Sequence, residues 1–305
     1  MSSAADNQRG ILAMLTAMAL FALNDTLLKI ATSDLPASQI MAIRGLFASV
    51  LAIALVFGTG AAGHFKALWS PVVAVRAALE ATLSFTFVTS LAHLQLANIT
   101  AILQTTPILI TLLTVLLGLE RVGWRRWIAI GGGFAGALLI VKPSLSGFNV
   151  YAGLAFLCAA LVAVRDLVTR SINGRVPSVV VMTASTLAVT FCGFGLSFGE
   201  TWRALTLSDL ALLATAAALV TAGNVAIIKA FRIGDVSVVS PFRYSVILAA
   251  LLAGYVVFGD FPDAVSLAGI ALIVSSGLYT FHREQIRLKE MRQTIDAAST
   301  AGESP

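Results

Sequence analysis

Ten apolar stretches, each close to the length that crosses a bilayer, occupy almost all of this 305-residue chain. A helix that spans the hydrocarbon core needs roughly 20 mostly apolar residues. Hydrophobic residues make up 58% of the chain and charged residues 11%, whereas about 25% of a soluble domain is charged. The composition therefore predicts an all-α membrane protein with ten transmembrane helices. The expected spans are residues 10–31, 38–58, 71–93, 97–118, 126–142, 150–170, 178–198, 208–231, 235–258 and 263–282.

Other interpretations of this composition disagree with the sequence pattern. A transmembrane β-barrel needs segments of about ten residues with alternating polarity, and the runs 108–118 and 247–258 do not alternate. The first stretch is longer than the apolar core of a cleaved signal peptide. Cys158 and Cys192 lie far apart, which predicts neither a disulfide nor a metal site. The net charge of +5 comes from basic loops, so no nucleic acid partner is expected.

Loop charge predicts how the chain threads the membrane, because lysine and arginine concentrate on the cytoplasmic side. With the N-terminus in the cytoplasm, thirteen basic residues fall on the inner side and three fall on the outer side, namely Lys29, Lys142 and Arg203. Both termini are then cytoplasmic, as an even number of spans requires. The loops are short, so we expect no catalytic domain outside the membrane.

The second five stretches repeat features of the first five at an offset near 140 residues. Asn24-Asp25…Lys29 matches Arg165-Asp166…Arg170, with an acid and a base four residues apart in both copies. Five crossings are an odd number, so the second half enters the membrane from the opposite side, as in inverted-repeat transporters. We expect a cytoplasmic N-terminus at 1–9, five-helix repeats at 10–142 and 150–282, and a cytoplasmic C-terminal tail at 283–305.

Diffuse motifs mark both halves. They are Asp25…Lys29, Arg44-Gly-Leu-Phe-Ala, Ala97…Pro107…Gly118-Leu-Glu120 and Ser240-Pro-Phe-Arg-Tyr244…Phe258-Gly-Asp260. With them the chain resembles the EamA group of the drug/metabolite transporter superfamily over roughly residues 10–282. The fourth and ninth helices of that family typically end in Gly-Glu, whereas Leu119 intervenes here in the first copy and Asp260 replaces the glutamate in the second. The resemblance implies ten helices in a bacterial inner membrane, cytoplasmic termini and movement of small metabolites.

Polar and ionisable residues inside the spans are the candidate functional residues. A charge at the bilayer centre costs about 2.5–3.5 kcal/mol on insertion scales, so each one needs a partner or a wet cavity. By depth, these residues form an outer cluster and an inner cluster, with Glu80 between the two. The outer cluster consists of Asn24, Asp25, Arg44 and Gln104, and the inner cluster consists of Arg165, Asp166, Asn224, Arg243 and Tyr244.

We expect each cluster to close by an ion pair and to act as a gate. The expected pairs are Asp25–Arg44 and Asp166–Arg243, with the substrate near Glu80 and Gln104. Structural roles compete with this hypothesis. Asp166 and Arg165 could instead extend their side chains along the helix to the inner membrane surface.

Two further residues have simple alternatives. Glu80 is one turn after Arg76, which predicts a local ion pair. Lys29 is expected to extend outward to the membrane surface.

Prolines and glycines predict local distortions of the spans. Pro107 and Pro241 lie inside spans, and each should kink its helix and free a carbonyl group beside a central cavity. Gly132 and Gly136 have the spacing of small residues that let two helices pack closely.

The expected function is secondary transport of a small amphipathic organic metabolite by alternating access. The chain carries no nucleotide-binding motif, and no cofactor or metal is expected. Coupling to protons at Asp25 or Glu80 and uncoupled movement fit equally well. The Arg44 and Ser240 motifs resemble importers of riboflavin or S-adenosylmethionine, which favours uptake of a flat heteroaromatic compound. Export of amino acids or drugs is the alternative.

Proteins of other classes fit the sequence less well. A membrane enzyme would need clustered catalytic side chains at one interface, and the three histidines His64, His93 and His282 fall near loops on different sides. A channel would not need the double set of gates predicted here. The expected partners are therefore a small-molecule substrate, the lipid bilayer and, if transport is coupled, protons.

Overall fold

A computed structural model describes residues 4–119, 123–141 and 149–302. In this part of the chain all regular structure is helical, with no strand. Helices satisfy their own backbone hydrogen bonds, which lipid cannot do for them. The elements are α1 (Ala4–Ala31), α2 (Ala37–Gly58), η1 (Ala61–Trp69), α3 (Pro71–His93), α4 (Leu96–Leu103), α5 (Thr106–Leu116), α6 (Trp124–Val141), α7 (Val150–Arg170), α8 (Ser178–Leu196), η2 (Ser197–Gly199), α9 (Leu207–Ile233), α10 (Val236–Val239), η3 (Ser240–Tyr244), α11 (Ser245–Phe258) and α12 (Ala264–Gly302).

The predicted all-α membrane fold is confirmed. Within the described residues, nine helical segments are long and apolar enough to cross a membrane. The remaining predicted span is α6, whose apolar part, Trp127–Val141, is shorter, and this was also the shortest of the ten expected spans. α12 continues past the predicted end of the last span as far as Gly302. Glu120 and Lys142, which entered the predicted repeat and the loop charges, lie outside the described residues.

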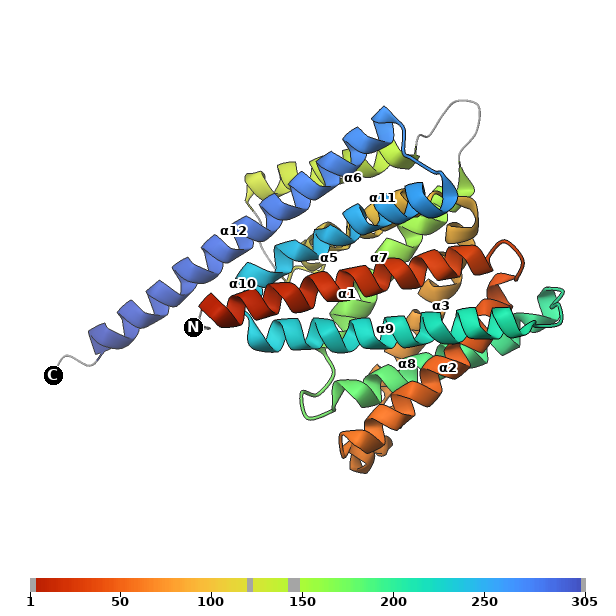
Figure 1. Ribbon diagram of the computed structural model, residues 1–305. Helices are drawn as coiled ribbons and strands as arrows, with labels where there is room; N and C mark the ends of the chain where they lie inside the picture. The colour runs from red at the N-terminus through yellow and green to blue at the C-terminus, as the bar shows by residue number, and fades with distance from the viewer. Residues whose placement is uncertain (1–3, 120–122, 142–148, 303–305) are drawn as a thin grey trace.

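The long helices run in broadly the same direction, and the start of α1 and the far end of α12 lie at the same end of the bundle (Figure 1). We call this end the terminal end and the opposite end, where α1 turns into α2, the distal end. α1 lies beside α9, α2 beside α8, and α6 beside α12 (Figure 1).

The contacts between helices follow a repeating pattern. If each span is replaced by the span five positions away along the chain, the same main contacts are found. α1 packs on α9 as α7 packs on α3, while α2 packs directly on α8 and α6 on α12. The Ser49 and Thr190 hydroxyls, 141 positions apart in sequence, lie 3.3 Å from each other in the α2–α8 contact. An inverted repeat requires pairings of this kind, with its axis between α2 and α8 and between α6 and α12.

The α6–α12 contact is close because glycines line it. A Cβ added to Gly136 would lie 2.7 Å from the carbonyl oxygen of Gly269, and one added to Gly132 would lie 2.7 Å from the Ser276 hydroxyl. The predicted role of the Gly132–Gly136 spacing in close helix packing is confirmed.

The fourth and ninth spans are broken. The fourth is divided into α4 and α5 just before Pro107, and the ninth is divided into α10, η3 and α11 around Pro241. Proline cannot donate to the carbonyl four residues earlier. The Thr106 hydroxyl takes over this role and donates to the Leu103 carbonyl at 2.6 Å. Thus a side chain satisfies the group that Pro107 frees, as membrane helices commonly do.

Candidate functional site

A small chamber lies inside the bundle among α1, α2, α3 and α7. Its volume is about 210 Å³, and Asn24, Asp25, Arg44 and Glu80 line it together with apolar side chains that include Phe21. We call it the inner chamber. The Phe21 ring packs closely against Gly223 of α9, because a Cβ added to this glycine would lie only 2.8 Å from the ring. This contact holds the ring in place. The chamber therefore combines charged groups with a fixed aromatic wall.

A larger cavity connects the inner chamber with the terminal end. This wide cavity has a volume of about 510 Å³ and shares Arg44, Glu80, Ser84 and Val220 with the chamber. It extends to residues 173–174, which are exposed in the loop between α7 and α8. Solutes can therefore approach the chamber from the terminal end.

A third cavity lies on the other face of α7. This side cavity measures about 440 Å³, and its lining includes Gln104, Asp166, Arg170, Arg243 and Tyr244. It shares only two residues with the inner chamber, both of them apolar. Residues one turn apart on a helix share a face, so Asp166 and Arg170 of α7 both point toward the side cavity. α7 therefore separates the two large cavities.

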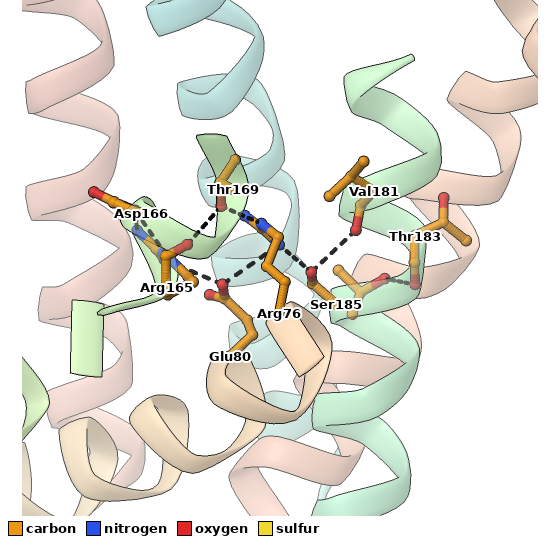
Figure 2. A network of polar contacts seen from close by, with 9 residues as sticks. Arg76, Glu80, Arg165, Asp166, Thr169, Val181, Thr183 and Ser185 are labelled. Carbon is orange, nitrogen blue, oxygen red and sulfur yellow. Dashed lines mark hydrogen bonds and ion pairs between the residues drawn. The ribbon is translucent and has the colours of Figure 1, made fainter. Parts of the chain in front are cut away.

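Arg165 on α7 joins two carboxylates. Its Nη1 lies 3.1 Å from Glu80 Oε2 of α3, and its Nη2 lies 2.7 Å from Asp166 Oδ1. Figure 2 shows Arg165 between these two acids. The side chains of Arg165 and Glu80 are 20% and 22% exposed, so water screens this pair only in part. The contact ties α3 to α7 where the inner chamber meets the wide cavity.

Arg76 extends this network to α8. Its Nε donates to the Thr169 hydroxyl at 2.9 Å and its Nη1 donates to the Ser185 hydroxyl (Figure 2). Its Nη1 is also 3.8 Å from Glu80, so the predicted local pair exists but is longer than the Arg165–Glu80 pair. The candidate set included neither Arg76 nor its two hydroxyl partners. The four-residue spacing of Arg76 and Glu80 was the only sequence signal for them.

The predicted Asp25–Arg44 ion pair is wrong. Among the described residues no ion pair within 4.0 Å joins the two, and Asp25 accepts instead from Asn24 Nδ2 at 2.8 Å. Arg44 is attracted to Asp25 and Glu80 across the chamber, but its Nε is buried without a partner. Both residues line the inner chamber, and α1 and α2 each pack along α9.

The predicted Asp166–Arg243 pair is also wrong. Asp166 Oδ1 is held by Arg165, the preceding residue, which reaches it without crossing a cavity. Arg243 makes no ion pair within the described part of the chain, and its side chain is open to the side cavity.

Gln104 was assigned to the wrong cluster. It lines the side cavity, and its Nε2 lies 3.5 Å from the Arg243 carbonyl oxygen. The break after α4 places Gln104 beside the broken ninth span and not beside α1. Pro107 and Pro241 both line this side cavity and neither lines the inner chamber, so the prediction that they lie beside the central cavity is wrong.

The other two members of the inner cluster lie in different places. Asn224 lines the wide cavity, and its Nδ2 donates to the Val220 carbonyl at 2.9 Å. Tyr244 lines the side cavity, and its hydroxyl is buried without a partner against Gly277 of α12. The predicted inner cluster is thus divided between two cavities by α7.

Polar contacts join the helix ends at the distal end. Lys29 Nζ donates to the Leu94 carbonyl oxygen and lies 4.0 Å from Asp260 Oδ2 and 5.4 Å from the centre of the Phe258 ring. Lys29 was expected to extend outward, but its side chain is only 14% exposed, because these groups hold it between α1, α3 and α11.

A second set of distal contacts links α2 to the loop before α9. The Ser38 backbone N–H donates to Glu200 Oε2 at 3.0 Å, and Gln39 Nε2 donates to the Arg203 carbonyl at 2.7 Å. Together with Lys29, these contacts tie both halves of the chain together at the distal end.

Comparisons with known proteins agree with this architecture. The sequence pattern of the EamA-like transporter family matches residues 8–142. A riboflavin transporter of Rhizobium johnstonii is 31% identical over 66% of this chain and 67% of its own length. A pseudopaline exporter, CntI, of Pseudomonas aeruginosa is 26% identical over 87% of this chain and 93% of its own. An S-adenosylmethionine uptake transporter of Rickettsia bellii is 26% identical over 66% of this chain and 68% of its own.

A solved crystal structure shares the fold. It is 20% identical in sequence, superimposes with a TM-score of 0.62, and the match covers 88% of this chain and 95% of that one.

Proposed function

The chain belongs to the EamA-like transporter family of the drug/metabolite transporter superfamily, and we propose that it moves its metabolite through the inner chamber by alternating access. One observation carries this proposal: a chamber lined by charged side chains lies inside a membrane bundle, and a larger cavity connects it to one end of that bundle. The wide cavity leads to it from the terminal end, while Lys29 and Ser38 help to hold the helix ends together at the distal end. This is the geometry of one state of an alternating-access cycle.

The chain would be built as two inverted repeats, residues 10–142 and 150–282. The matched helix pairings and the Ser49–Thr190 contact support this division. In such proteins, the substrate lies near the membrane midplane between the repeats, next to broken helices. The terminal end would face the cytoplasm of a bacterial inner membrane, because the basic loop residues concentrate there. The state described here is then open to the cytoplasm.

The substrate would bind among Asn24, Asp25, Arg44 and Glu80. Asn24 Oδ1 and Arg44 Nε are buried without hydrogen-bond partners. A buried polar atom without a partner costs about 1–3 kcal/mol, and a substrate that supplies the partners removes this cost. The matching ligand offers a donor to Asn24 and an acceptor to Arg44, with an apolar face against Phe21. We assign these groups to binding and propose no catalytic step for them.

The ion-pair network would act as the structural link between binding and gating. Arg165 holds Glu80, which lines the chamber, and Asp166, which lines the side cavity. A substrate that attracts Glu80 or Arg44 would weaken the link between α3 and α7. The Lys29 contacts would have to separate when the distal end opens.

We favour a flat heteroaromatic substrate taken up into the cell. Phe21 and Phe87 line the chamber, and the chamber's donors and acceptors suit the polar edge of such a ring. The chamber's volume of about 210 Å³ is below the roughly 300–1,000 Å³ of typical ligand sites, so part of the substrate would extend into the wide cavity. Riboflavin and S-adenosylmethionine, which a riboflavin transporter and an S-adenosylmethionine uptake transporter among the relatives carry, are the first compounds to test.

Export is the second candidate direction. The pseudopaline exporter aligns over 93% of its length, more than the riboflavin transporter does. An opening toward the cytoplasm occurs in the cycle of importers and exporters alike, so the direction must be measured.

Uptake into proteoliposomes tests the proposal. The purified protein should accumulate riboflavin or S-adenosylmethionine from a panel that also contains amino acids, and Arg44→Ala should lose this uptake. Repeating the assay with an imposed pH gradient distinguishes proton coupling at Asp25 or Glu80 from uncoupled movement. Growth of a riboflavin auxotroph on low vitamin is a simpler assay. Failure to rescue growth, with efflux of a panel compound from loaded vesicles, would identify an exporter.

A further inference from the structure

The side cavity is lined by two arginines, Arg170 and Arg243, and by one carboxylate, Asp166. Away from the helix ends, the spans hold more arginines than carboxylates. The arginines are Arg44, Arg76, Arg165 and Arg243, and the carboxylates are Asp25, Glu80 and Asp166. An uncompensated charge is costly inside a membrane, so an arginine there without an acidic partner indicates a site for an anion.

The contacts identify which arginine is left over. Arg76 and Arg165 both contact Glu80, and Arg165 also holds Asp166. Arg44 faces Asp25 and Glu80 across the inner chamber. Arg243 is attracted to Asp166, but that carboxylate already accepts two hydrogen bonds from Arg165, at 3.0 and 2.7 Å. Arg243 is therefore the cation without its own anion.

We propose that the side cavity binds a phosphate group against the Arg243 guanidinium. The planar guanidinium fork matches the geometry of this oxyanion. Gln104 and Ser240 line the cavity beside Arg243 and add further hydrogen-bonding groups. Arg170 lies at the exposed end of α7 and lines the same cavity, so a second cation attracts the anion at the entrance.

The proposed site is separate from the proposed substrate site. α7 stands between the side cavity and the wide cavity, and the side cavity meets the inner chamber only through the apolar side chains of Leu103 and Val162. The cavity's volume of about 440 Å³ accommodates a free anion or a phospholipid head group. Both present the same phosphate chemistry, and an experiment can tell them apart.

Binding is measured on the delipidated protein in an uncharged detergent. The thermal midpoint of unfolding is followed by tryptophan fluorescence while inorganic phosphate or dioleoyl phosphatidylglycerol is titrated, with dioleoyl phosphatidylcholine as the uncharged reference. The wild type should show a saturable rise in midpoint. In Arg243→Gln the apparent affinity should be about tenfold weaker, since a neutral amide replaces the charged fork. Arg243→Lys should recover part of it.

Two variants make the result specific. Arg170→Gln, at the exposed cavity entrance, should weaken binding severalfold without affecting the fold. Arg203→Gln removes the same charge at the distal end, where that arginine is bound to Asp209 at 3.0 Å, and should bind like the wild type. A response to phosphate identifies a soluble anion, and a response to phosphatidylglycerol alone identifies a lipid head group. No saturable rise with either probe, or equal rises in the wild type and both cavity variants, would overturn the proposal.

Discussion

Gly136 of α6 and Gly269 of α12 face each other reciprocally. A Cβ on Gly136 would lie 2.7 Å from the Gly269 carbonyl oxygen, and a Cβ on Gly269 would lie 2.6 Å from the Gly136 carbonyl oxygen. When two similar helices cross at a twofold axis, the two residues at the crossing are expected to contact each other's backbone in the same way. Small residues at such crossings let backbones approach closely in membranes.

Gly136→Ala should destabilise the protein by about 1–3 kcal/mol, because the added methyl group must displace backbone and not a flexible side chain. Gly131→Ala is a matched control on the same helix, since nothing lies within 4 Å of a Cβ there. The control should be neutral or stabilising by up to about 1 kcal/mol, because alanine is the better helix former. Thermal unfolding in detergent measures both. Equal stability of the two variants would contradict the described α6–α12 packing.

Glu80 and Arg165 should be energetically coupled. A double-mutant cycle with Glu80→Gln and Arg165→Gln should give a coupling energy of about 0.5–3 kcal/mol, because the pair is mostly shielded from water. Arg165→Gln alone should cost more than Glu80→Gln alone, since Arg165 contacts two carboxylates and its loss removes both contacts.

The Arg203–Asp209 pair provides a matched comparison for that cycle. Its N–O distance of 3.0 Å is similar, but the arginine side chain is 40% exposed, twice as much as Arg165. Its coupling should be weaker than that of Glu80–Arg165, because water screens an exposed ion pair. If the exposed pair were coupled more strongly than Glu80–Arg165, the central network would not be a structural link.

Arg44→Ala, Asn24→Ala and Asp25→Asn should each lower kcat/KM for transport at least about tenfold, the loss of roughly 1.4 kcal/mol of binding to the substrate in transit. Expression and unfolding midpoint should change little, because Arg44 makes no ion pair among the described residues. Ser49→Ala is the control on α2, since its hydroxyl contacts Thr190 and not the chamber. Full transport by all three chamber variants at normal expression would remove the chamber from the mechanism.

Lys29→Ala should favour opening at the distal end. Loss of about 1 kcal/mol from the closed state shifts the equilibrium roughly fivefold. The reporter is Ser84→Cys, which lines the chamber, in a background where Cys158 and Cys192 are replaced by alanine. A membrane-impermeant maleimide added from the distal face should label it faster when Lys29 is absent.

Lys66→Ala is the control for the labelling experiment, because Lys66 is an exposed lysine on η1 at the other end of the bundle. It should leave the labelling rate unchanged. Unaltered labelling in Lys29→Ala would show that the contacts of this lysine do not hold the distal end closed.

Sequence alone was enough to predict the spans, because crossing a bilayer requires long apolar helices whatever their neighbours are. It also predicted the breaks at Pro107 and Pro241, since a proline disrupts its own helix wherever that helix lies. The depth of Asp25, Arg44, Asp166 and Arg243 followed from counting residues along each span. All of these are properties of one helix in a membrane.

The partners of the charges were decided by the tertiary structure. Depth suggested Asp25–Arg44 and Asp166–Arg243, but Asp25 and Arg44 line the same chamber without forming an ion pair, and Arg165 holds the acid of the second pair. Charge attraction alone does not select a partner; the side chains must also face each other, and this depends on how each helix is rotated and which helix lies next to it. Contacts between residues distant in sequence set both, and one span's sequence does not record them.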